Sequence, residues 1–377
     1  MKPLDGITLL DLSRVLAGPY CTMLLAELGA RVIKVERPDG GDDARAFGPH
    51  VDGQSGYFAS VNRGKQSLAL DLKAPADRAL FERLLGRADV LVENYRPGAL
   101  ARLGYDWATL HARWPRLIYG AVSGFGHTGP DRHKPAYDMI VQGMGGLMSV
   151  TGEPGRPPVR VGTSVGDITA GLFLSNGLLA ALYQRERTGQ GVFVDVAMLD
   201  GQIAILENAI ARYFATGQAP GPLGARHPAI TPFGAFKAAD GHLTLACGND
   251  ALFASLCAVL GAADLAADPR FADNPGRTAH ADALQAALEA HLAKRPVAEW
   301  LPLLDAAGVP CGPIHDVGQA VHHPQVQARH MVVRAGGLQM AGNPIKISGM
   351  PDPTERPAAP ALDGDRAAIL AWLEETP

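Results

Sequence analysis

One carboxylate stands out in the stretch RVGTSVGDITAGLF at 160–173, because Asp167 lies between an apolar run and the start of a long apolar segment. In such a poorly solvated setting a carboxylate becomes more reactive as a nucleophile or a base. A structural role is the commoner explanation for such a residue, in which Asp167 caps the following helix by accepting backbone N–H groups. The two roles are compatible, since a helix N-terminus presents free N–H groups to an oxyanion formed beside it. Asp167 is therefore the first candidate for a nucleophile.

Three glycines in VSGFGHTGPD at 122–131 have the spacing G-x-G-x-x-G and follow the apolar run LIYGAV at 117–122. This spacing forms a dinucleotide-binding turn only where a helix opens directly after it to meet the pyrophosphate. Pro135 would end any helix after about one turn, because proline lacks an N–H group and disfavours a helical residue before it. The sequence therefore argues against an NAD-dependent oxidoreductase.

Small and basic residues follow several of the expected strands. In the turn SRVLAGPY at 13–20, Ala17 and Gly18 are small enough to let a ligand approach the backbone. The basic residues are Arg37, Lys73 and Arg96, with Arg102 on the next short helix. Taken singly, a turn of this kind is more often an ordinary connection. Each basic residue, taken singly, is more often a solvated surface charge. Together they favour a phosphate-bearing ligand, because the carboxyl ends of strands in an open α/β sheet line the ligand crevice.

Strands and helices alternate through the first part of the chain. Apolar runs predict strands at 7–12, 31–36, 67–72, 89–93, 117–122 and 192–197. Helices are expected at 19–28, 76–85, 97–103, 167–187 and 199–216. This alternation predicts βαβ units and a parallel sheet covered on both faces, and right-handed crossovers would make the large domain Rossmann-like.

The composition changes after this alternating region, which we take as residues 1–216. The segment 217–232 is rich in glycine and proline and is expected to be a linker. Residues 233–325 are expected to form a smaller α+β domain that begins with a hairpin around Asp240-Gly241. Further strands near 343–347 and a closing helix at 364–375 are expected in the tail.

Composition excludes several classes of function. The formal net charge of −4 argues against a surface built for nucleic acid or an anionic membrane. The four cysteines are scattered without metal-ligand spacing, which favours reduced thiols in a cytoplasmic protein and no zinc or other metal site. The longest apolar run, 168–183, is too short for a membrane span and carries Ser175 and Asn176, so we expect a buried core helix.

The ordered motifs of the chain resemble the class III CoA-transferases, or CaiB/BaiF family, which includes formyl-CoA transferase and carnitine CoA-transferase. The motifs are LAGPY, KVERP, NRGKQSLALDLK, ENYRPGAL, SGFGHTGP, AYDMIVQGMGGLMSVTG, VGTSVGDITAG, RTGQGVFVDVAMLDG and GVPCGPI. The resemblance implies that 326–377 returns to complete the large domain and that two ring-shaped chains interlock as a homodimer. It also implies CoA transfer from an acyl-CoA donor to a free carboxylic acid through an aspartyl-CoA thioester, with CoA as substrate and no permanently bound cofactor.

The resemblance carries over to individual residues. Asp167 in GDITAG is similar to the nucleophilic aspartate of the family, and Tyr137 and Asp138 match its Tyr–acid pair. His227 is a further candidate on the substrate side. The implied CoA-binding residues are Val15, Leu16, Ala17, Arg37, Leu70, Lys73, Asn94, Tyr95, Arg96 and Arg102.

Two departures from the family pattern bear on the substrate. Leu16 stands where some members carry glutamine, so that side-chain contact to the acyl group is absent. The segment ARHPAITPFGAF at 225–236 stands where formyl-CoA transferase has a run of glycines, which argues against oxalate or formate. A weak similarity in this stretch favours C4–C6 dicarboxylic acids such as succinate, itaconate, mesaconate or glutarate.

Two alternatives share the predicted fold. A 2-methylacyl-CoA racemase would shuttle an α-proton between a histidine and an aspartate, but this chain has Tyr137-Asp138 there, and a tyrosine with a pKa of about 10 is a poor proton shuttle. A CoA-binding regulatory protein without chemistry would bind CoA and form no adduct on Asp167.

Overall fold

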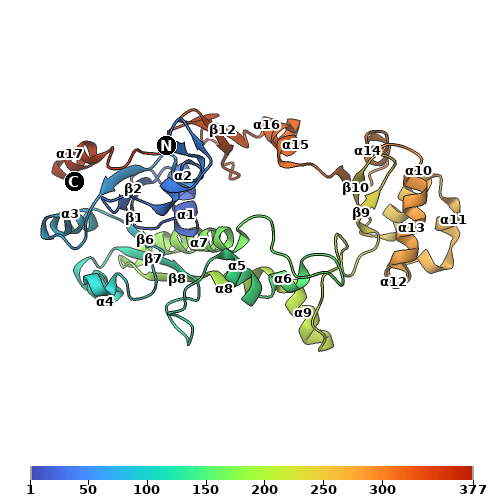
Figure 1. Ribbon diagram of the computed structural model, residues 1–377, viewed down its shortest axis with the longest axis horizontal. Coiled ribbons are helices and arrows are strands. Elements are labelled where there is room, and N and C mark those ends of the chain that lie inside the picture. Colours follow the sequence, from blue (N-terminus) through green and yellow to red (C-terminus); the bar gives the residue numbers. More distant parts are fainter. Residues whose placement is uncertain (1, 376–377) are drawn as a thin grey trace. The chain divides into compact units, whose positions relative to one another are not determined.

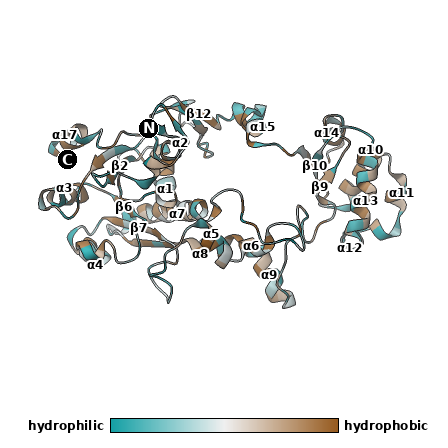
Figure 2. Ribbon diagram, viewed as in Figure 1, coloured by the Kyte–Doolittle hydropathy of each residue, from teal (hydrophilic) through white to brown (hydrophobic). Residues whose placement is uncertain are grey.

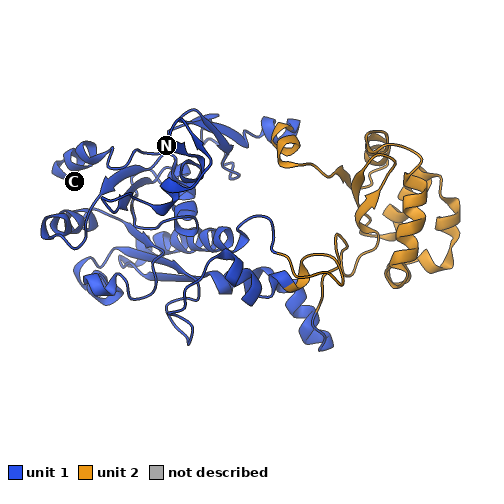
Figure 3. Cartoon of the chain, in the orientation of Figure 1, with its two compact units in different colours: residues 1–148, 160–219, 323–377 blue, residues 149–159, 220–322 orange. Residues whose placement is uncertain are grey.

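The structure, a computed structural model, describes residues 2–375 and consists of two compact units (Figure 3). Unit 1 contains Met1–Met148, Arg160–Ala219 and His323–Pro377, and unit 2 contains Ser149–Val159 and Pro220–His322. The short segment 149–159 was expected in the first domain but belongs to unit 2. A hydrogen bond of 2.9 Å from the Gly224 amide to the Gly152 carbonyl oxygen joins it to the rest of that unit.

Unit 1 is built on a six-stranded parallel sheet with the strand order β5-β2-β1-β6-β7-β8 (Figure 1). The strands are β1 (Thr8–Asp11), β2 (Arg31–Glu36), β5 (Gln66–Ala69), β6 (Val90–Glu93), β7 (Ile118–Ser123) and β8 (Phe193–Ala197). The predicted α/β fold with a parallel sheet is thus confirmed. The strand order reverses between β1 and β6, and in sheets of this kind ligands bind outside the carboxyl ends of the strands at that point.

Helices cover both faces of this sheet, which is why its strands other than β8 are buried almost throughout. On one face α1 (Ala17–Glu27) and α7 (Val165–Thr188) pack in a core that includes Leu9. On the other face α3 (Pro75–Leu85), α4 (Trp107–Arg113) and α17 (Arg366–Glu374) pack in a core that includes Leu10. Consecutive residues of one strand therefore enter opposite cores, as the alternation of side chains along a strand requires.

Several smaller elements complete unit 1. They are α2 (Gly56–Asn62), α5 (Asp138–Met144), α8 (Met198–Ile205), α9 (Glu207–Thr216), α16 (Pro324–Ala328), β12 (Val332–Ala335), β13 (Leu338–Ala341) and β14 (Glu355–Arg356). The segment expected as one helix at 199–216 is two, because the backbone departs from helical geometry at Leu206. The expected helix at 97–103 is only the 3-10 turn Ala101–Leu103, since Gly98 has a φ of +87°.

The tail differs from the strand expected near 343–347. Its antiparallel hairpin lies earlier, in β12 and β13, which Gly336 and Gly337 connect with φ values of +58° and +83°. A two-residue turn with both φ values positive suits the twist of a hairpin and favours glycine. Pro344 cannot donate to a sheet ladder, which opposes a strand in the later segment.

Helix α7 is only partly the buried core helix that was expected. One side, with Leu174 and Leu178, is fully buried, whereas Phe173 is 40% exposed and Tyr183 is also exposed. Its length and hydropathy alone would suffice to cross a membrane, but in the structure it packs on α1, β7, β8 and α8. Figure 2 shows that α8 beside it is also apolar.

Unit 2 has its own core and a small antiparallel sheet in the order β11-β10-β9. The predicted hairpin is present as β9 (Phe233–Lys237) and β10 (His242–Ala246), and β11 (Cys311–Pro313) completes the sheet. The helices are α10 (Asp250–Leu260), α11 (Ala263–Ala267), α12 (Asn274–Ala279), α13 (Ala281–Leu292), α14 (Val297–Ala306) and α15 (Val317–His322). Leucines of α10, α13 and α14 pack against the buried face of the hairpin.

Candidate active site

Asp167 lies in the first turn of α7, after the N-cap Ser164. Two glycines let other elements approach this turn closely. A Cβ on Gly171 would lie 2.6 Å from the carbonyl oxygen of Ala17 in α1, and a Cβ on Gly166 would lie 2.8 Å from Val141 in α5. The absence of side chains at these two positions therefore brings the starts of α1, α5 and α7 together.

A cavity of about 200 Å³ lies where these helices begin, at the carboxyl end of the sheet. Its walls come from the turn after β1, the loops after β6 and β7, and the starts of α7 and α8. The predicted residues that line it are Val15, Leu16, Ala17, Asn94, Tyr95, Arg96, Tyr137 and Asp167. Residues from opposite sides of the β1–β6 reversal thus meet in one cavity.

Asp167 is half-buried, and its carboxylate accepts no hydrogen bond from any of residues 2–375. The N-cap alternative for Asp167 is therefore wrong, since Ser164 occupies that position. Burial, and to a lesser extent the negative charge of Asp138, raises the pKa of Asp167 to about 7. A poorly solvated carboxylate without a hydrogen-bond partner is well suited to nucleophilic attack.

Asp138, the first residue of α5, stabilises the start of α7 by a hydrogen bond. It is 8% exposed and does not line the cavity, and its Oδ1 accepts a hydrogen bond of 2.8 Å from the Gly166 amide. Its Oδ2 accepts one of 2.8 Å from Gln142 and lies 3.5 Å from the guanidinium of Arg160. The neighbouring Tyr137, by contrast, is 79% exposed and faces the cavity.

A second cavity, of about 280 Å³, continues along the same edge of the sheet. Three of the predicted residues, Arg37, Leu70 and Lys73, line it, and Tyr95 borders both cavities. Arg102 is not among the lining residues, although Leu103 beside it is. The two cavities share Tyr95 as a lining residue and lie at the carboxyl ends of β1, β2, β5 and β6, and we refer to them together as the cleft.

Two predicted residues have contacts that bear on their roles. The side chain of Asn94 holds the turn after β1, with Nδ2 donating to the Arg14 carbonyl at 2.7 Å and Oδ1 accepting from the Arg14 amide at 2.8 Å. His227 lies in unit 2, where it lines a separate cavity of about 200 Å³ with its ring 5.1 Å from that of Phe233. His227 therefore does not belong to the cavity of Asp167 within unit 1.

Sequence reasoning missed three charged residues of the cleft. Arg14 and Lys134 line the Asp167 cavity, and Asp43 lies between the two arginines that face the two cavities. Asp43 accepts from Arg14 at 2.9 Å and from Arg37 at 2.8 Å. Asp43 begins the short 3-10 helix Asp43–Ala46 in a polar stretch without periodicity, so no local pattern could have identified it.

The structure also bears on the glycine turn and on groups of metal-ligating side chains. After the glycine turn at 124–129 the first helix is α5, which begins only at Asp138, so no helix N-terminus follows the turn as a dinucleotide site requires. Among residues 2–375 the structure contains no group of three or more His, Cys, Asp or Glu side chains that could hold a metal ion.

Comparison with known proteins agrees with this geometry. The profile of CoA-transferase family III matches residues 4–366. An acetyl-CoA:oxalate CoA-transferase from Acetobacter aceti is 52% identical over 368 residues, covering 97% of this chain and 95% of that protein. A succinate–glutarate CoA-transferase from Agrobacterium fabrum is 42% identical over 384 residues, covering 99% and 96%.

The fold is shared with a solved structure. The crystal structure of a CAIB/BAIF family protein from Brucella suis matches with a TM-score of 0.89 and 40% identity, covering 99% of this chain and 100% of that one. A parallel six-stranded sheet, a cleft at its carboxyl edge and a family profile over nearly the whole sequence therefore lead to one conclusion. The chain belongs to CoA-transferase family III and is a CoA-transferase.

Proposed function

We propose that this chain moves CoA from an acyl-CoA donor to a short dicarboxylic acid through covalent intermediates on Asp167. The observation that carries this proposal is the Asp167 carboxylate, which lines the cavity at the switch point of the sheet and has no hydrogen-bond partner within residues 2–375. The cleft supports a CoA site in which Arg37, Leu70 and Lys73 contact the nucleotide end. Val15, Leu16, Ala17, Tyr95 and Arg96 would contact the thioester end.

The reaction proceeds by four acyl transfers on one carboxylate. An Asp167 oxygen attacks the thioester carbonyl carbon, the C–S bond breaks, and a mixed anhydride and the CoA thiolate form. The thiolate attacks the aspartyl carbonyl carbon, the anhydride C–O bond breaks, and the donor acid leaves as a carboxylate. The acceptor carboxylate then attacks the aspartyl carbonyl carbon of this thioester, the C–S bond breaks, and a second mixed anhydride and the CoA thiolate form. The thiolate attacks the carbonyl carbon of the acceptor acyl group, the anhydride C–O bond breaks, and the new acyl-CoA and the Asp167 carboxylate are released. No proton is gained or lost over the cycle.

Each transfer passes through an oxyanion that needs hydrogen-bond donors. The start of α1 supports this role, because its N-cap Leu16 gives no side-chain cap and Leu16 and Ala17 both border the cavity. Backbone N–H groups in the first turn of a helix have no partner within the helix. Leu16, in the place of a glutamine, leaves oxyanion stabilisation to the backbone.

Cations near the nucleophile support a dicarboxylic acceptor. Arg14, Arg96 and Lys134 line the cavity with Asp167, so a second carboxylate on the acid would meet positive charge there. The names of the relatives include oxalate and glutarate. The relative named for oxalate is a reason to keep oxalate among the acceptors. This departs from the expectation that the missing glycine run argues against oxalate. We therefore propose dicarboxylic acids from C2 to C6 as the acceptor class.

The assembly state is a further part of the proposal. Apolar side chains exposed on α5, α7 and α8, among them Met139, Phe173 and Ile203, support burial of this surface against a second copy in an interlocked homodimer. Sedimentation equilibrium tests this, and a stable monomer at micromolar concentration contradicts it. We also propose a cytoplasmic enzyme without a permanently bound cofactor, so the purified, active protein is expected to release no small molecule when it is denatured.

Trapping tests the covalent mechanism. The enzyme is incubated with succinyl-CoA and hydroxylamine, digested and analysed by mass spectrometry, and a hydroxamate is expected on Asp167. Asp167→Asn is expected to give neither hydroxamate nor CoA exchange, whereas unchanged transfer by this variant contradicts the proposal. A screen of oxalate, succinate, glutarate, itaconate and mesaconate against acetyl-CoA and succinyl-CoA identifies the acceptor. Loss of an α-deuterium from a chiral 2-methylacyl-CoA without any acceptor would favour the racemase.

A further inference from the structure

Val15, in the wall of the Asp167 cavity, has a backbone conformation that valine rarely adopts. Its φ is +65°, in the left-handed region, and it directly precedes Leu16 and Ala17 at the start of α1. This region is unfavourable for residues with a Cβ and most unfavourable for β-branched ones. Such a conformation persists only where surrounding contacts impose it.

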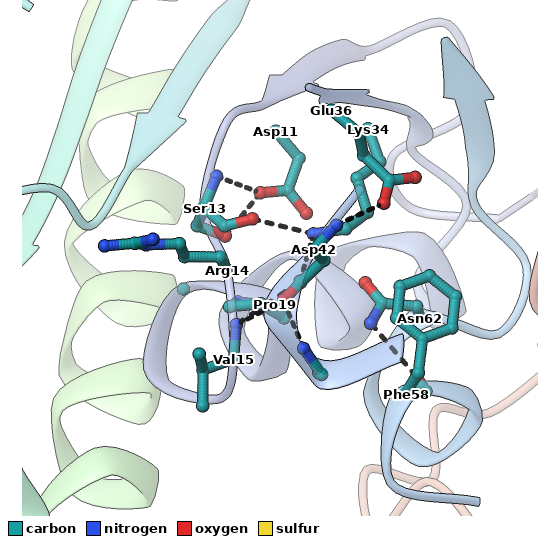
Figure 4. A network of polar contacts seen from close by, with 12 residues as sticks. Asp11, Ser13, Arg14, Val15, Pro19, Lys34, Glu36, Asp42, Phe58 and Asn62 are labelled. Atoms are coloured by element: carbon teal, nitrogen blue, oxygen red, sulfur yellow. Dashed lines mark hydrogen bonds and ion pairs between the residues drawn. The ribbon is translucent and has the colours of Figure 1, made fainter. Parts of the chain in front are cut away.

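The Val15 amide itself is held by Asp42, a buried residue in the loop after β2 (Figure 4). Asp42 is 4% exposed, and its Oδ1 accepts hydrogen bonds from the Val15 amide at 3.0 Å and from the Ala44 amide at 2.9 Å. The backbone amide of Asp42 in turn donates to Glu36 at 2.9 Å. The Ala44 amide and the anchored backbone of Asp42 therefore both hold the Asp42 carboxylate beside the Val15 amide.

A buried lysine completes the arrangement. Lys34 of β2 is fully buried, and its Nζ lies 2.9 Å from Asp42 Oδ2 and donates to the Ser13 carbonyl at 2.7 Å. One ammonium group thus holds both Asp42 and the backbone just before Val15. Burial opposes the charge of Lys34, but Asp11, Asp42 and Glu36 outweigh it and raise its pKa, so the pair stays ionised.

We propose that Asp42 is a positioning residue for CoA transfer, which holds Val15 left-handed so that the Leu16 and Ala17 N–H groups face the acyl oxygen at Asp167. This inference rests on the proposed function. Asp42 does not line the cavity and acts only through Val15. Lys34 serves as its counter-ion. Without a partner a buried carboxylate would become protonated, and its hydrogen bond to the Val15 amide would weaken.

A double-mutant cycle separates this role from a general effect on folding. Glycine adopts a positive φ without strain, so Val15→Gly keeps the turn without Asp42. We expect Asp42→Asn to lower kcat by about tenfold or more while the KM for acyl-CoA stays within about twofold, as loss of aligned oxyanion donors predicts. In the Val15→Gly background the same substitution is expected to lower kcat by no more than about threefold. An equal loss in both backgrounds, or an unchanged kcat, overturns the proposal.

A matched control and a second measurement keep the test decisive. Asp106 accepts a hydrogen bond of 3.0 Å from the Thr109 amide at the start of α4, so Asp106→Asn removes the charge of a comparable backbone acceptor outside the cavity and should leave kcat unchanged. If Asp42→Asn does not fold, Asp42→Glu keeps a charge for Lys34 and shifts the oxygen away from Val15, and the same cycle applies. Hydrogen exchange at the Val15 amide should accelerate in either variant, and an unchanged rate overturns the inference.

These readouts separate the inference from the proposed function. Absence of a wild-type adduct on Asp167 would refute the mechanism, while exchange at the Val15 amide would still report on Asp42.

Discussion

Gly171 of α7 lies so close to Ala17 of α1 that a Cβ on residue 171 would be 2.6 Å from the Ala17 carbonyl oxygen. Gly171 lies about one helical turn after Asp167, so this contact sets how near Asp167 comes to the start of α1. The separation between the proposed nucleophile and the proposed oxyanion donors therefore depends on a residue that has no side chain.

Replacing Gly171 with alanine should push the two helices apart. We expect Gly171→Ala to lower the free energy of unfolding by about 1–3 kcal/mol, as overpacking does, and kcat by about tenfold or more. Chemical denaturation and steady-state kinetics measure the two effects. The control is Gly201→Ala in α8, where a Cβ would meet its nearest neighbour at 3.4 Å and helix propensity favours alanine. Equal effects of the two substitutions on kcat would contradict this account.

Removing the Asp167 charge should stabilise the protein at high pH. The pKa of Asp167 is about 7 in the folded state, above its ordinary value of 3.8, so the unfolded chain loses this proton first as pH rises. The free energy of unfolding therefore falls between about pH 4 and pH 7 and stays low above that. Asp167→Asn should raise it by about 1–3 kcal/mol at pH 8, after allowance for partial exposure, and hardly at pH 4. A variant less stable than wild type at pH 8 would contradict the assignment.

The rate of adduct formation should rise with pH through about 7 and then level off, because only the ionised Asp167 attacks the thioester. Burial is the larger cause of this raised pKa and Asp138 the smaller one. Asp138→Asn should therefore move the midpoint to lower pH without returning it to the ordinary value. Single-turnover kinetics with succinyl-CoA between pH 5 and pH 9 measure the midpoint. A midpoint that moves upward in Asp138→Asn would show that the two carboxylates do not repel each other.

Removal of positive charge from the second cavity should weaken binding of the acyl-CoA donor and leave binding of the acceptor acid unchanged. Lys73→Ala and Arg37→Ala are expected to raise the KM for the acyl-CoA donor by about five- to fiftyfold, as loss of a charged contact to phosphate predicts, and to leave the KM for the acceptor unchanged. The donor effect should shrink at high ionic strength. Arg113→Ala on α4, which removes an exposed arginine paired with Glu82, serves as the control. An increase confined to the KM of the acceptor would place the acid, rather than CoA, in this cavity.

Much of unit 1 could be predicted because its elements have strong local patterns. The run RVIKVE gives β2 at the expected residues, and the apolar segment after Asp167 gives α7. The break between α8 and α9 was missed, since the whole stretch is compatible with one helix and only the backbone at Leu206 interrupts it. The segment 149–159 was assigned to the first domain because a short polar loop carries no sign of the body to which it is hydrogen-bonded.

The residues of the candidate site also differ in how far their local sequence could identify them. Asp167 became a candidate from its neighbours in the chain, because a carboxylate between two apolar segments is either a helix cap or a reactive group, and the family resemblance favoured the second. Asn94 lines the Asp167 cavity, but the hydrogen bonds of its side chain to the backbone of Arg14 join residues far apart in sequence, and no local pattern could show them. The bridge that Asp43 forms between Arg14 and Arg37 also joins three separate segments.

The sequence by itself determined the alternating strands and helices, the family and the candidacy of Asp167 as the nucleophile, since each depends on residues close together in the chain. Tertiary structure decided the left-handed turn at Val15, the burial of Lys34 with Asp42, and the approach of Ala17 to Gly171. The physical reason is that a strained backbone or a buried charge is tolerated only where partners from other segments stabilise it. Those partners become neighbours only when the sheet and its covering helices have assembled.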